Sequence, residues 1–579
     1  MLIVALQILF STICTLALCM FVGWGPARLG LPATLRPYAP LLAPLLGYAI
    51  AMWAGYIGVS TILNLRWSLG VLLLAATALN TLAWRRTGPP HITALREHSG
   101  IVVVFALALL AGIWPLLQYG YPTVIGRGWD PETYLPMAQY LTDFPLAQIG
   151  SAPANPLRDL VRNPPRIALT LGFSVLHGFT MILSNQTALD TYAPVMALLR
   201  AFGVLAIYIW LRACMGLDRI SGLLAATLTA AGSLMLWVAF FNFGMQIASW
   251  PLIGLGLTLG LAAVEQLSER GITAWPVALT AGIALAALPV AYYPVLTIFG
   301  PMAVGLGLAR AIEAIWPATN PDQATKSAQN RWPSMLRLLL ASIALGLITL
   351  VFAAPTISDY FKGFAFQYSL VAQAVGPDRF ISLTDILGLT TFRLEPGGDQ
   401  PPQLLVWAAL AAVTIMAIAA CSTLASRRWL LVLLPFAAYL AWLRYGRPYE
   451  YAYMKSSAYA GMALWGVLLF GWQQLATRLP ASVRRPILVV LIALPLAATL
   501  WAQAITLAEH GSSPALFGRD LVALETPAAQ IPSGATVLIS ADERFVGPNN
   551  GLLASILYGR ELWGRISTAY FGLNRWPVG

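Results

Sequence analysis

Apolar segments of about 20 residues recur along this chain from its first residue to about residue 508. A helix needs roughly 20 mainly apolar residues to cross a bilayer. The pattern therefore predicts an all-α, polytopic membrane protein with about 14 transmembrane helices. The expected spans are 1–22, 39–59, 68–84, 100–118, 190–211, 220–240, 247–265, 273–291, 293–310, 336–354, 403–422, 429–443, 456–476 and 486–508.

Composition supports this class. The 579 residues are 58% hydrophobic and only 10% charged, and the mean hydropathy is +0.72, values typical of a multi-pass membrane protein. The net charge of +11 is compatible with a nucleic-acid partner, but the Lys and Arg residues lie in short loops between spans. The positive-inside rule accounts for that placement, so we expect membrane lipid and no nucleic acid as a partner.

The basic loops also predict an orientation. Four loops agree on one alternation in which they are cytoplasmic and both termini are external. The segment 166–189 is interpreted as re-entrant or interfacial, because counting it as a span would place Arg212 and Arg219 outside. We expect an integral protein of the cell membrane. The residues that mark the four loops are Arg85, Arg86 and Arg96; Arg310, Lys326, Arg331 and Arg337; Arg427 and Arg428; and Arg478, Arg484 and Arg485.

The chain divides into two predicted parts. Residues 1–508 form the multi-span domain, with external loops 119–189, 355–402 and 444–455. Residues 509–579 contain a β-branched run at 536–540, followed by an apolar segment of helical period. This pattern predicts a small external α/β segment that packs on the helix ends.

The four cysteines and four histidines show no spacing typical of a metal site.

The stretch "GRGWDPETYLPMAQYL" (126–141) concentrates charged residues in an external loop. In one interpretation Asp130 is the N-cap of a helix, with Pro131 at its first position and Glu132 in its first turn. In the other, Asp130 and Glu132 face a cavity, where a carboxylate can accept a proton or hold a divalent cation. The interpretations are compatible, because Glu132 stays free if Asp130 is the cap.

With this acidic motif, the chain resembles the GT-C superfamily of glycosyltransferases that use polyprenyl-phosphate-linked sugars. The resemblance comprises many spans, "GWDPETY" in an early external loop, a half-buried segment "RNPPRIALTLGFSVLHG", and a small external C-terminal part. Two features depart from the family pattern: three spans precede the usual first one, and the acids are Asp-x-Glu instead of adjacent.

The resemblance implies a reaction and roles for the acids. A sugar, hexose or pentose, would pass from a polyprenyl-phosphate donor to a glycan, lipid or protein acceptor of the cell envelope, with inversion at the anomeric carbon. Asp130 would be the general base, and Glu132 would assist it or bind a cation, Mg²⁺ or Mn²⁺. The sequence itself establishes no cofactor.

Cationic residues would then offset the charge on the departing phosphate. The strongest candidates lie in "LRYGRPYEYAYMK" (443–455), while an aromatic belt with snorkelling basic residues is the alternative interpretation. Arg127 in the first loop is a further candidate, with Arg158, Arg162 and Arg166 in reserve. In 443–455 the expected phosphate ligands are Arg444, Arg447 and Lys455, and the expected sugar or isoprenoid contacts are Tyr449, Tyr451 and Tyr453.

Two other classes of function stay open. A transporter or lipid flippase places ionisable residues within its spans and uses broken helices, and "ALPVAYYPVL", with Pro289 and Pro294, fits a broken helix. However, the spans contain almost no acids, and Arg200 is the clearest buried charge. A non-catalytic subunit of a membrane complex is the third class. External loops that carry charges of both signs favour an enzyme.

Overall fold

The structure is a computed structural model. It describes residues 2–88, 97–126, 128, 130–148, 164–315, 331–370, 380–393, 397–422, 427–446, 448–513, 515–539, 552–553, 555–558 and 560–564.

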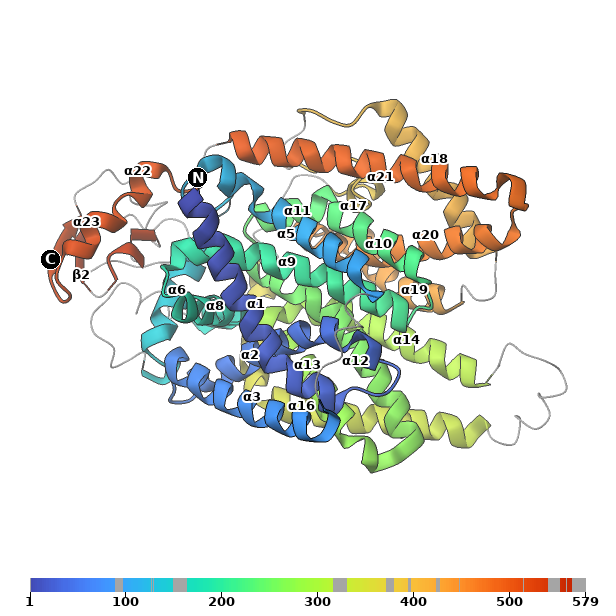
Figure 1. Cartoon of the computed structure of the whole chain (residues 1–579), viewed down its shortest axis with the longest axis horizontal. Helices are drawn as coiled ribbons and strands as arrows, with labels where there is room; N and C mark the ends of the chain where they lie inside the picture. The colour runs from blue at the N-terminus through green and yellow to red at the C-terminus, as the bar shows by residue number, and fades with distance from the viewer. Residues whose placement is uncertain are drawn as a thin grey trace.

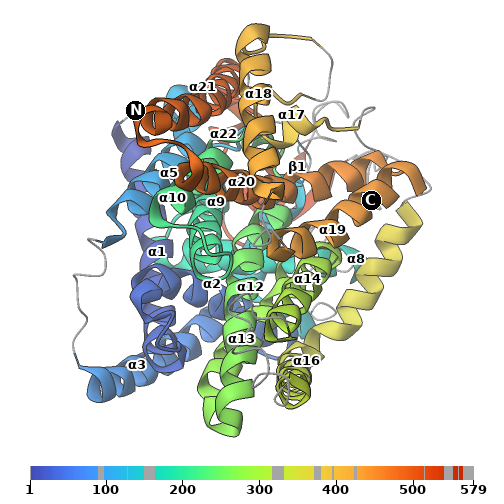
Figure 2. The same ribbon diagram turned by 90° about the vertical axis from the view of Figure 1, so that its right-hand side faces the viewer.

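The described chain is a bundle of long helices around one helix, α9 (Ala188–Ala213). The apolar part of α9 is buried inside the bundle over its whole length. A capping box fixes its start, because Thr187 and Asp190 each bond the other's backbone N–H. Figure 2 shows α9 and α12 in the middle of the bundle. The helices that pack on α9 include α1 (Leu2–Gly30), α5 (Ser99–Tyr119), α10 (Arg219–Ala231) and α12 (Gly244–Arg270).

The first three helices form one side of the bundle (Figure 2). Helix α1 crosses α2 (Ala39–Ser60) so closely that a Cβ on Gly23 would collide with the backbone of α2. Small residues allow such close crossings between membrane helices. Asn64 caps α3 (Leu65–Thr87) by accepting a hydrogen bond from Trp67 N at 3.1 Å.

The other long helices complete the bundle. They are α13 (Trp275–Tyr292), α14 (Leu296–Ile315), α16 (Arg331–Leu370), α18 (Gln403–Cys421), α19 (Arg427–Ala441), α20 (Glu450–Arg478) and α21 (Ala481–Ser512). The short elements are η1 (Arg36–Tyr38), η2 (Leu146–Gln148), η3 (Gly271–Ala274), η4 (Tyr293–Val295), α17 (Leu383–Ile386) and the π-helical η7 (Trp442–Gly446).

Two helices are broken within the bundle. Helix α10 ends at Gly232, and α11 (Ser233–Phe240) continues at an angle of 45°. A helix end leaves carbonyl groups without intrahelical donors, and the buried guanidinium of Arg200 donates to Ala230 O as well as to Ala108 O of α5. The second break separates α13 from α14 at η4, in the segment whose prolines predict it.

One end of the bundle carries the smaller elements. Figure 1 shows α6 (Pro131–Asp143) and α8 (Pro164–Ser184) at the same end as the N-terminus and the tail elements. Thr123 donates to Phe517 O at 2.9 Å, and Leu516 N to Val124 O at 3.3 Å. The tail therefore packs on the loop that precedes Asp130. The tail elements are α22 (Arg519–Val522), α23 (Glu525–Gln530) and the parallel strands β1 (Thr536–Ile539) and β2 (Glu561–Gly564).

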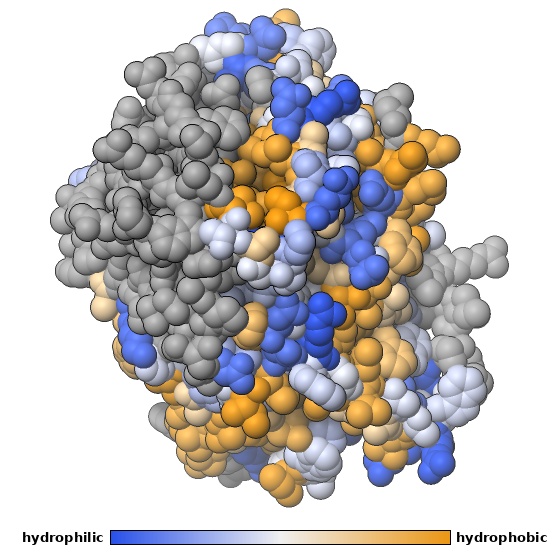
Figure 3. Space-filling view, turned by 90° about the vertical axis from the view of Figure 1, so that its left-hand side faces the viewer, coloured by the Kyte–Doolittle hydropathy of each residue, from blue (hydrophilic) through white to orange (hydrophobic). Residues whose placement is uncertain are grey.

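The surface of this end is mixed. In Figure 3, which views it directly, hydrophilic and hydrophobic residues both reach the surface over the part that is not grey. Helix α8 lies behind that surface, and its described residues Leu171–Ser184 are mostly buried against α1, α2 and α13. Helix α8 spans 21 residues, and its part from Leu171 to Ser184 is apolar. The re-entrant or interfacial interpretation of 166–189 stays a prediction.

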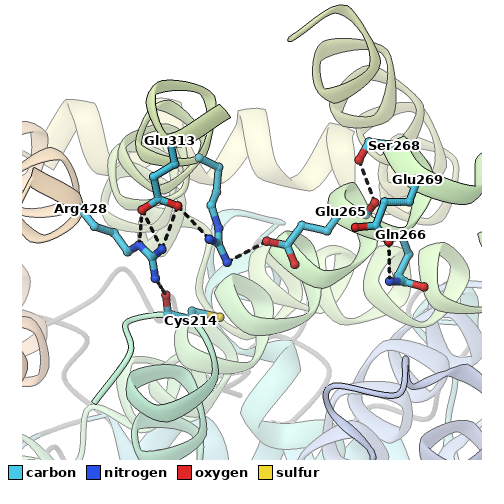
Figure 4. A network of polar contacts seen from close by, with 8 residues as sticks. Cys214, Glu265, Gln266, Ser268, Glu269, Glu313 and Arg428 are labelled. Atoms are coloured by element: carbon cyan, nitrogen blue, oxygen red, sulfur yellow. Dashed lines mark hydrogen bonds and ion pairs between the residues drawn. The ribbon is translucent and has the colours of Figure 1, made fainter. Parts of the chain in front are cut away.

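Ion pairs join neighbouring helices at the opposite end of the bundle (Figure 4). Arg428 makes two hydrogen bonds of 2.8 Å to the carboxylate of Glu313 and one of 2.7 Å to Cys214 O. Arg310 bridges Glu313 and Glu265, both at 2.8 Å. Because Glu265 is 21 residues after Gly244, this network lies roughly 30 Å along α12 from the Asp130 end. It joins α12, α14 and α19 where the sequence predicts the cytoplasmic side.

The helices indicate a multi-pass membrane protein. Within the described ranges, ten helical stretches are long and apolar enough to span a bilayer, or eleven if the bent pair α10 and α11 is one span. Each of the fourteen predicted ranges falls on a helix. The lower number arises because α12, α13 and α14, which follow one another through η3 and η4, count as one candidate of 70 residues, and because α20 is not among the candidates.

Two predicted loops are helical in part. Helix α16 runs through Pro355 to Leu370, so the predicted loop 355–402 begins as helix. The predicted loop 444–455 is reduced to the residues between η7 and the start of α20 at Glu450. Gly446 and Pro448 indicate a loop in the sequence, but the turn between the two helices is short.

Candidate functional site

Asp130 directly precedes α6, and its carboxylate is not used to cap the helix. Its backbone carbonyl accepts hydrogen bonds from Thr133 N and Tyr134 N at 3.0 Å, whereas its side chain makes no capping bond. Instead, the Tyr134 hydroxyl donates to Asp130 Oδ2 at 3.1 Å. Pro131 does occupy the first helical turn, as predicted. Within the described residues, the hydrogen bonds at the helix start therefore use one oxygen of the carboxylate and leave the other without a side-chain or capping bond.

The loop before Asp130 is held against the corner between α11 and α12. Gly126 and Gly128 have φ values of +74° and +127°, and a Cβ on either would collide with a carbonyl oxygen of Phe240 or Phe241. Only glycine adopts this backbone without strain at such close range. Asn242 Nδ2 donates to Ile125 O at 3.0 Å. The corner thus fixes where Asp130 lies.

The same corner contributes to the environment of Lys455. The Lys455 ammonium lies 4.2 Å from the ring centroid of Phe243, 4.4 Å from that of Tyr451 and 5.7 Å from that of Tyr292. A cation over aromatic faces at these distances is stabilised by the ring quadrupoles. Lys455 and Asp130 also attract each other. The structure therefore brings together a carboxylate and an ammonium group that are far apart in the sequence.

Several tyrosines surround this pair. Tyr192 of α9 and Tyr451 of α20 lie within electrostatic reach of Asp130, and Tyr192 stacks on Tyr134 with ring centroids 6.5 Å apart. Tyr292 and Tyr293 come from the break between α13 and α14. Sequence reasoning did not assign Tyr192, Phe243, Tyr292 or Tyr293 to the site. The only signal was the broken-helix pattern in "ALPVAYYPVL".

Burial controls the ionisation of Asp130. It raises the pKa of the carboxyl above its ordinary value, because a charge is costly away from water. The Lys455 ammonium and the Tyr134 hydroxyl act in the opposite direction and lower this pKa. A carboxylate with a raised pKa is a stronger base than an exposed aspartate. The site therefore combines a proton acceptor with a nearby positive charge.

The predicted basic and aromatic stretch divides into two groups. Because α20 begins at Glu450, Tyr451 and Lys455 are four residues apart on one helix face. Tyr449 lies beside Tyr451, with ring centroids 6.4 Å apart. Tyr453 lies on another face and packs on Phe380 at 5.2 Å. These contacts associate Tyr449, Tyr451 and Lys455 with Asp130.

Arg444 belongs to the second group. Its guanidinium lies over the rings of Phe380, Tyr445 and Tyr453, at 5.4, 5.3 and 6.0 Å from their centroids. Tyr453 OH also donates to Ile381 O at 3.4 Å. Arg444 and Tyr453 therefore pack on the segment that begins at Phe380.

Three predicted residues cannot be placed in this geometry. Arg127, Arg447 and the side chain of Glu132 lie outside the described part of the chain, as do Arg158 and Arg162. Among the residues that the structure describes, no group of three or more His, Cys, Asp or Glu side chains could hold a metal ion. The assignment of Glu132 to a divalent cation stays a prediction.

A second carboxylate of the predicted external loops has a structural role. Asp385 and Ser382 form a capping box at the start of α17, and Thr390 Oγ1 donates to Asp385 Oδ1 at 2.8 Å. Both oxygens of this buried carboxylate are therefore used. Asp130 differs, because its one side-chain hydrogen bond in the described chain comes from Tyr134.

Comparison with protein-family models finds no match for this chain, and comparison with curated proteins finds none either. The resemblance to the GT-C superfamily therefore stays an expectation from the sequence.

Proposed function

We propose that this chain is a membrane glycosyltransferase of the GT-C type, with Asp130 as its general base. The observation that carries the proposal is the Asp130 carboxylate, which does not cap the helix, has a raised pKa and is attracted by the Lys455 ammonium. Support also comes from its place at the end of the bundle where the tail packs. In this proposal that end is external, all fourteen predicted ranges cross the membrane, and 509–579 is the external α/β segment.

The reaction uses one proton transfer and one displacement. Asp130 takes the proton from an acceptor hydroxyl, and the hydroxyl oxygen attacks the anomeric carbon of the sugar. The bond between that carbon and the phosphate oxygen breaks on the opposite face, so the configuration inverts and polyprenyl phosphate leaves. A positioned carboxylate accelerates such a step by about 10² to 10⁴.

Lys455 offsets the negative charge that develops on the departing phosphate. Tyr449 and Tyr451 contact the sugar or the first isoprene units, since they lie beside Lys455 on α20 or directly before it. Glu132 assists the base or holds Mg²⁺ or Mn²⁺. Arg444, Arg447 and Arg127 are retained as phosphate ligands in the wider site, and Tyr453 positions Arg444.

A transporter or flippase is the second candidate, because one observation favours it. The break between α13 and α14 supplies Tyr292 next to Lys455, and broken helices beside a binding site are common in transporters. The two functions differ in outcome: an enzyme breaks the bond between sugar and phosphate, whereas a transporter moves its substrate unchanged.

The purified chain in proteoliposomes tests this difference. It should be given a panel of polyprenyl-phosphate-linked hexoses and pentoses, with glycans and lipids extracted from membranes as acceptors, and products should be measured by mass spectrometry. We expect one donor to release polyprenyl phosphate and form a glycosidic product, and liposomes without protein to form none. Movement of an intact donor or sugar without bond cleavage would support the transporter function. If no donor is cleaved, the proposed glycosyltransferase function is overturned.

A further inference from the structure

A groove on the outer surface of α1 and α3 is separate from the Asp130 site. It has a volume of about 430 Å³ and lies near the ends of the two helices that the basic loop at 85–86 predicts to be cytoplasmic. Its walls are almost entirely apolar, and the exposed side chains of Phe21 and Trp84 flank it. The lining residues are Ala17, Met20, Phe21, Trp24, Arg28, Asn80, Ala83, Trp84, Thr87 and Gly88.

Arg28 is held at one end of this groove. Its Nε and Nη2 donate to Thr87 Oγ1 at 3.1 and 2.7 Å, and Nη2 also donates to the carbonyls of Thr87 and Gly88 at 2.9 and 3.2 Å. Its guanidinium lies 5.7 Å from the ring centroid of Trp24. These bonds cap the end of α3, but in the described chain none of them uses Nη1. The head of Arg28 is thus fixed and can still donate.

The charged residues that line or adjoin the groove are the basic residues Arg28, Arg85 and Arg86. The first carboxylate in the sequence is Glu97, so the first 96 residues contain no acid. Arg85 and Arg86 are exposed in the last turn of α3. Within the described residues, no ion pair involves Arg28, Arg85 or Arg86. A negatively charged group would complement this end of the groove.

We propose that the groove between α1 and α3 binds one anionic phospholipid of the surrounding membrane. Its phosphate accepts hydrogen bonds from Arg28, and one acyl chain lies along Met20, Phe21 and Ala17. Trp24 and Trp84 suit the boundary between headgroup and chain, where tryptophan is enriched. Basic residues at that depth attract anionic headgroups. This site is independent of the sugar-transfer proposal, because it lies on a different face and uses none of its residues.

Native mass spectrometry of the full chain tests the site. The chain should be titrated with palmitoyl-oleoyl phosphatidylglycerol, and phosphatidylcholine with the same acyl chains serves as the neutral probe. Arg28→Gln removes the headgroup ligand, and Ala17→Trp fills the groove from an exposed position. Arg36→Gln, which replaces an exposed arginine of η1 that does not line the groove, is the matched control for lost charge.

We expect the parent to retain more phosphatidylglycerol than phosphatidylcholine. Arg28→Gln should lower phosphatidylglycerol retention about fivefold, the effect of one basic residue near an anionic surface. Ala17→Trp should also lower it, because the indole occupies the place of the acyl chain, while Arg36→Gln matches the parent. The proposal is overturned if both lipids are retained equally, if either groove variant retains as much phosphatidylglycerol as the parent, or if Arg36→Gln loses as much. Melting temperatures show that each variant is folded.

Discussion

Asp130 illustrates how much a single residue reveals in sequence and in structure. Asp-Pro-Glu predicts a helix start, and α6 does begin at Pro131. The sequence does not predict that the carboxylate leaves the backbone N–H groups of α6 uncapped and accepts a bond from the Tyr134 hydroxyl instead. It also does not predict the nearness of Lys455 and of the tyrosines of α9 and α20, which no local pattern connects to residue 130.

The pH dependence of transfer follows from the contacts of Asp130. The base acts when it is deprotonated, so the rate rises with pH through its pKa, and burial places this rise above that of an ordinary aspartate. The Tyr134 hydroxyl lowers the pKa. Tyr134→Phe should therefore move the acid limb of kcat/KM to higher pH and leave the rate at the plateau nearly unchanged.

The control is Tyr140→Phe, a second tyrosine of α6. It should keep the parental acid limb, because Tyr140 is not a cause of the Asp130 shift. An acid limb that stays in place in Tyr134→Phe, or moves to lower pH, would show that Asp130 is not the titrating base.

At the scale of elements, the apolar pattern predicts the positions of the helices well, but it predicts the residues at which they begin and end poorly. Every predicted span falls on a helix, because about 20 apolar residues leave few other structures open in a membrane. The end of α16 and the start of α20 could not be predicted, since both continue into polar segments. The start of α20 decides which aromatic residues face Lys455, so the predicted cluster at 443–455 was only partly brought together.

The corner between α11 and α12 is the element that positions Asp130, and Gly126 tests it. Gly126→Ala adds a collision with Phe240 O to the strain of a positive φ. Gly88→Ala has a similar φ of +71° but nothing within 4 Å of its Cβ, so it measures the strain alone. We expect Gly88→Ala to cost about 1 kcal/mol of unfolding free energy and Gly126→Ala clearly more, about 2 to 4 kcal/mol.

Thermal unfolding of the two purified variants measures this difference, and transfer should also fall in Gly126→Ala because Asp130 shifts. Equal melting temperatures for the two variants would mean that the corner yields and does not fix the loop.

At the scale of the whole molecule, the two ends of the bundle differ. One end carries Asp130, α6 and the tail, and the other carries the Arg310, Glu313 and Arg428 network. The positions of the loop arginines predicted that these groups would lie at opposite ends. The pairing of Arg428 with Glu313 was not predictable, because it joins helices that are distant in sequence.

Cysteine labelling in intact cells tests which end is external. Gln148→Cys and Ser512→Cys, both at exposed positions, should react with an impermeant thiol reagent when introduced into a Cys421→Ser chain. The native Cys421 is exposed at the end of α18 and reports on the other side. It should react only after the membrane is permeabilised. The reverse pattern would place the Asp130 end inside the cell.

The most direct test of the central claim is the rate of sugar transfer by Asp130→Asn in proteoliposomes. Tyr134 can still donate to the new amide oxygen, and the carboxylate caps no helix, so the melting temperature should change little. The proton acceptor is lost, and transfer should fall about a hundredfold or more. Asp143→Asn, which removes the half-buried carboxylate that pairs with Arg66 at the end of α6, should keep the parental rate. If Asp130→Asn also transfers sugar at the parental rate, Asp130 is not the base, and the proposed mechanism is contradicted.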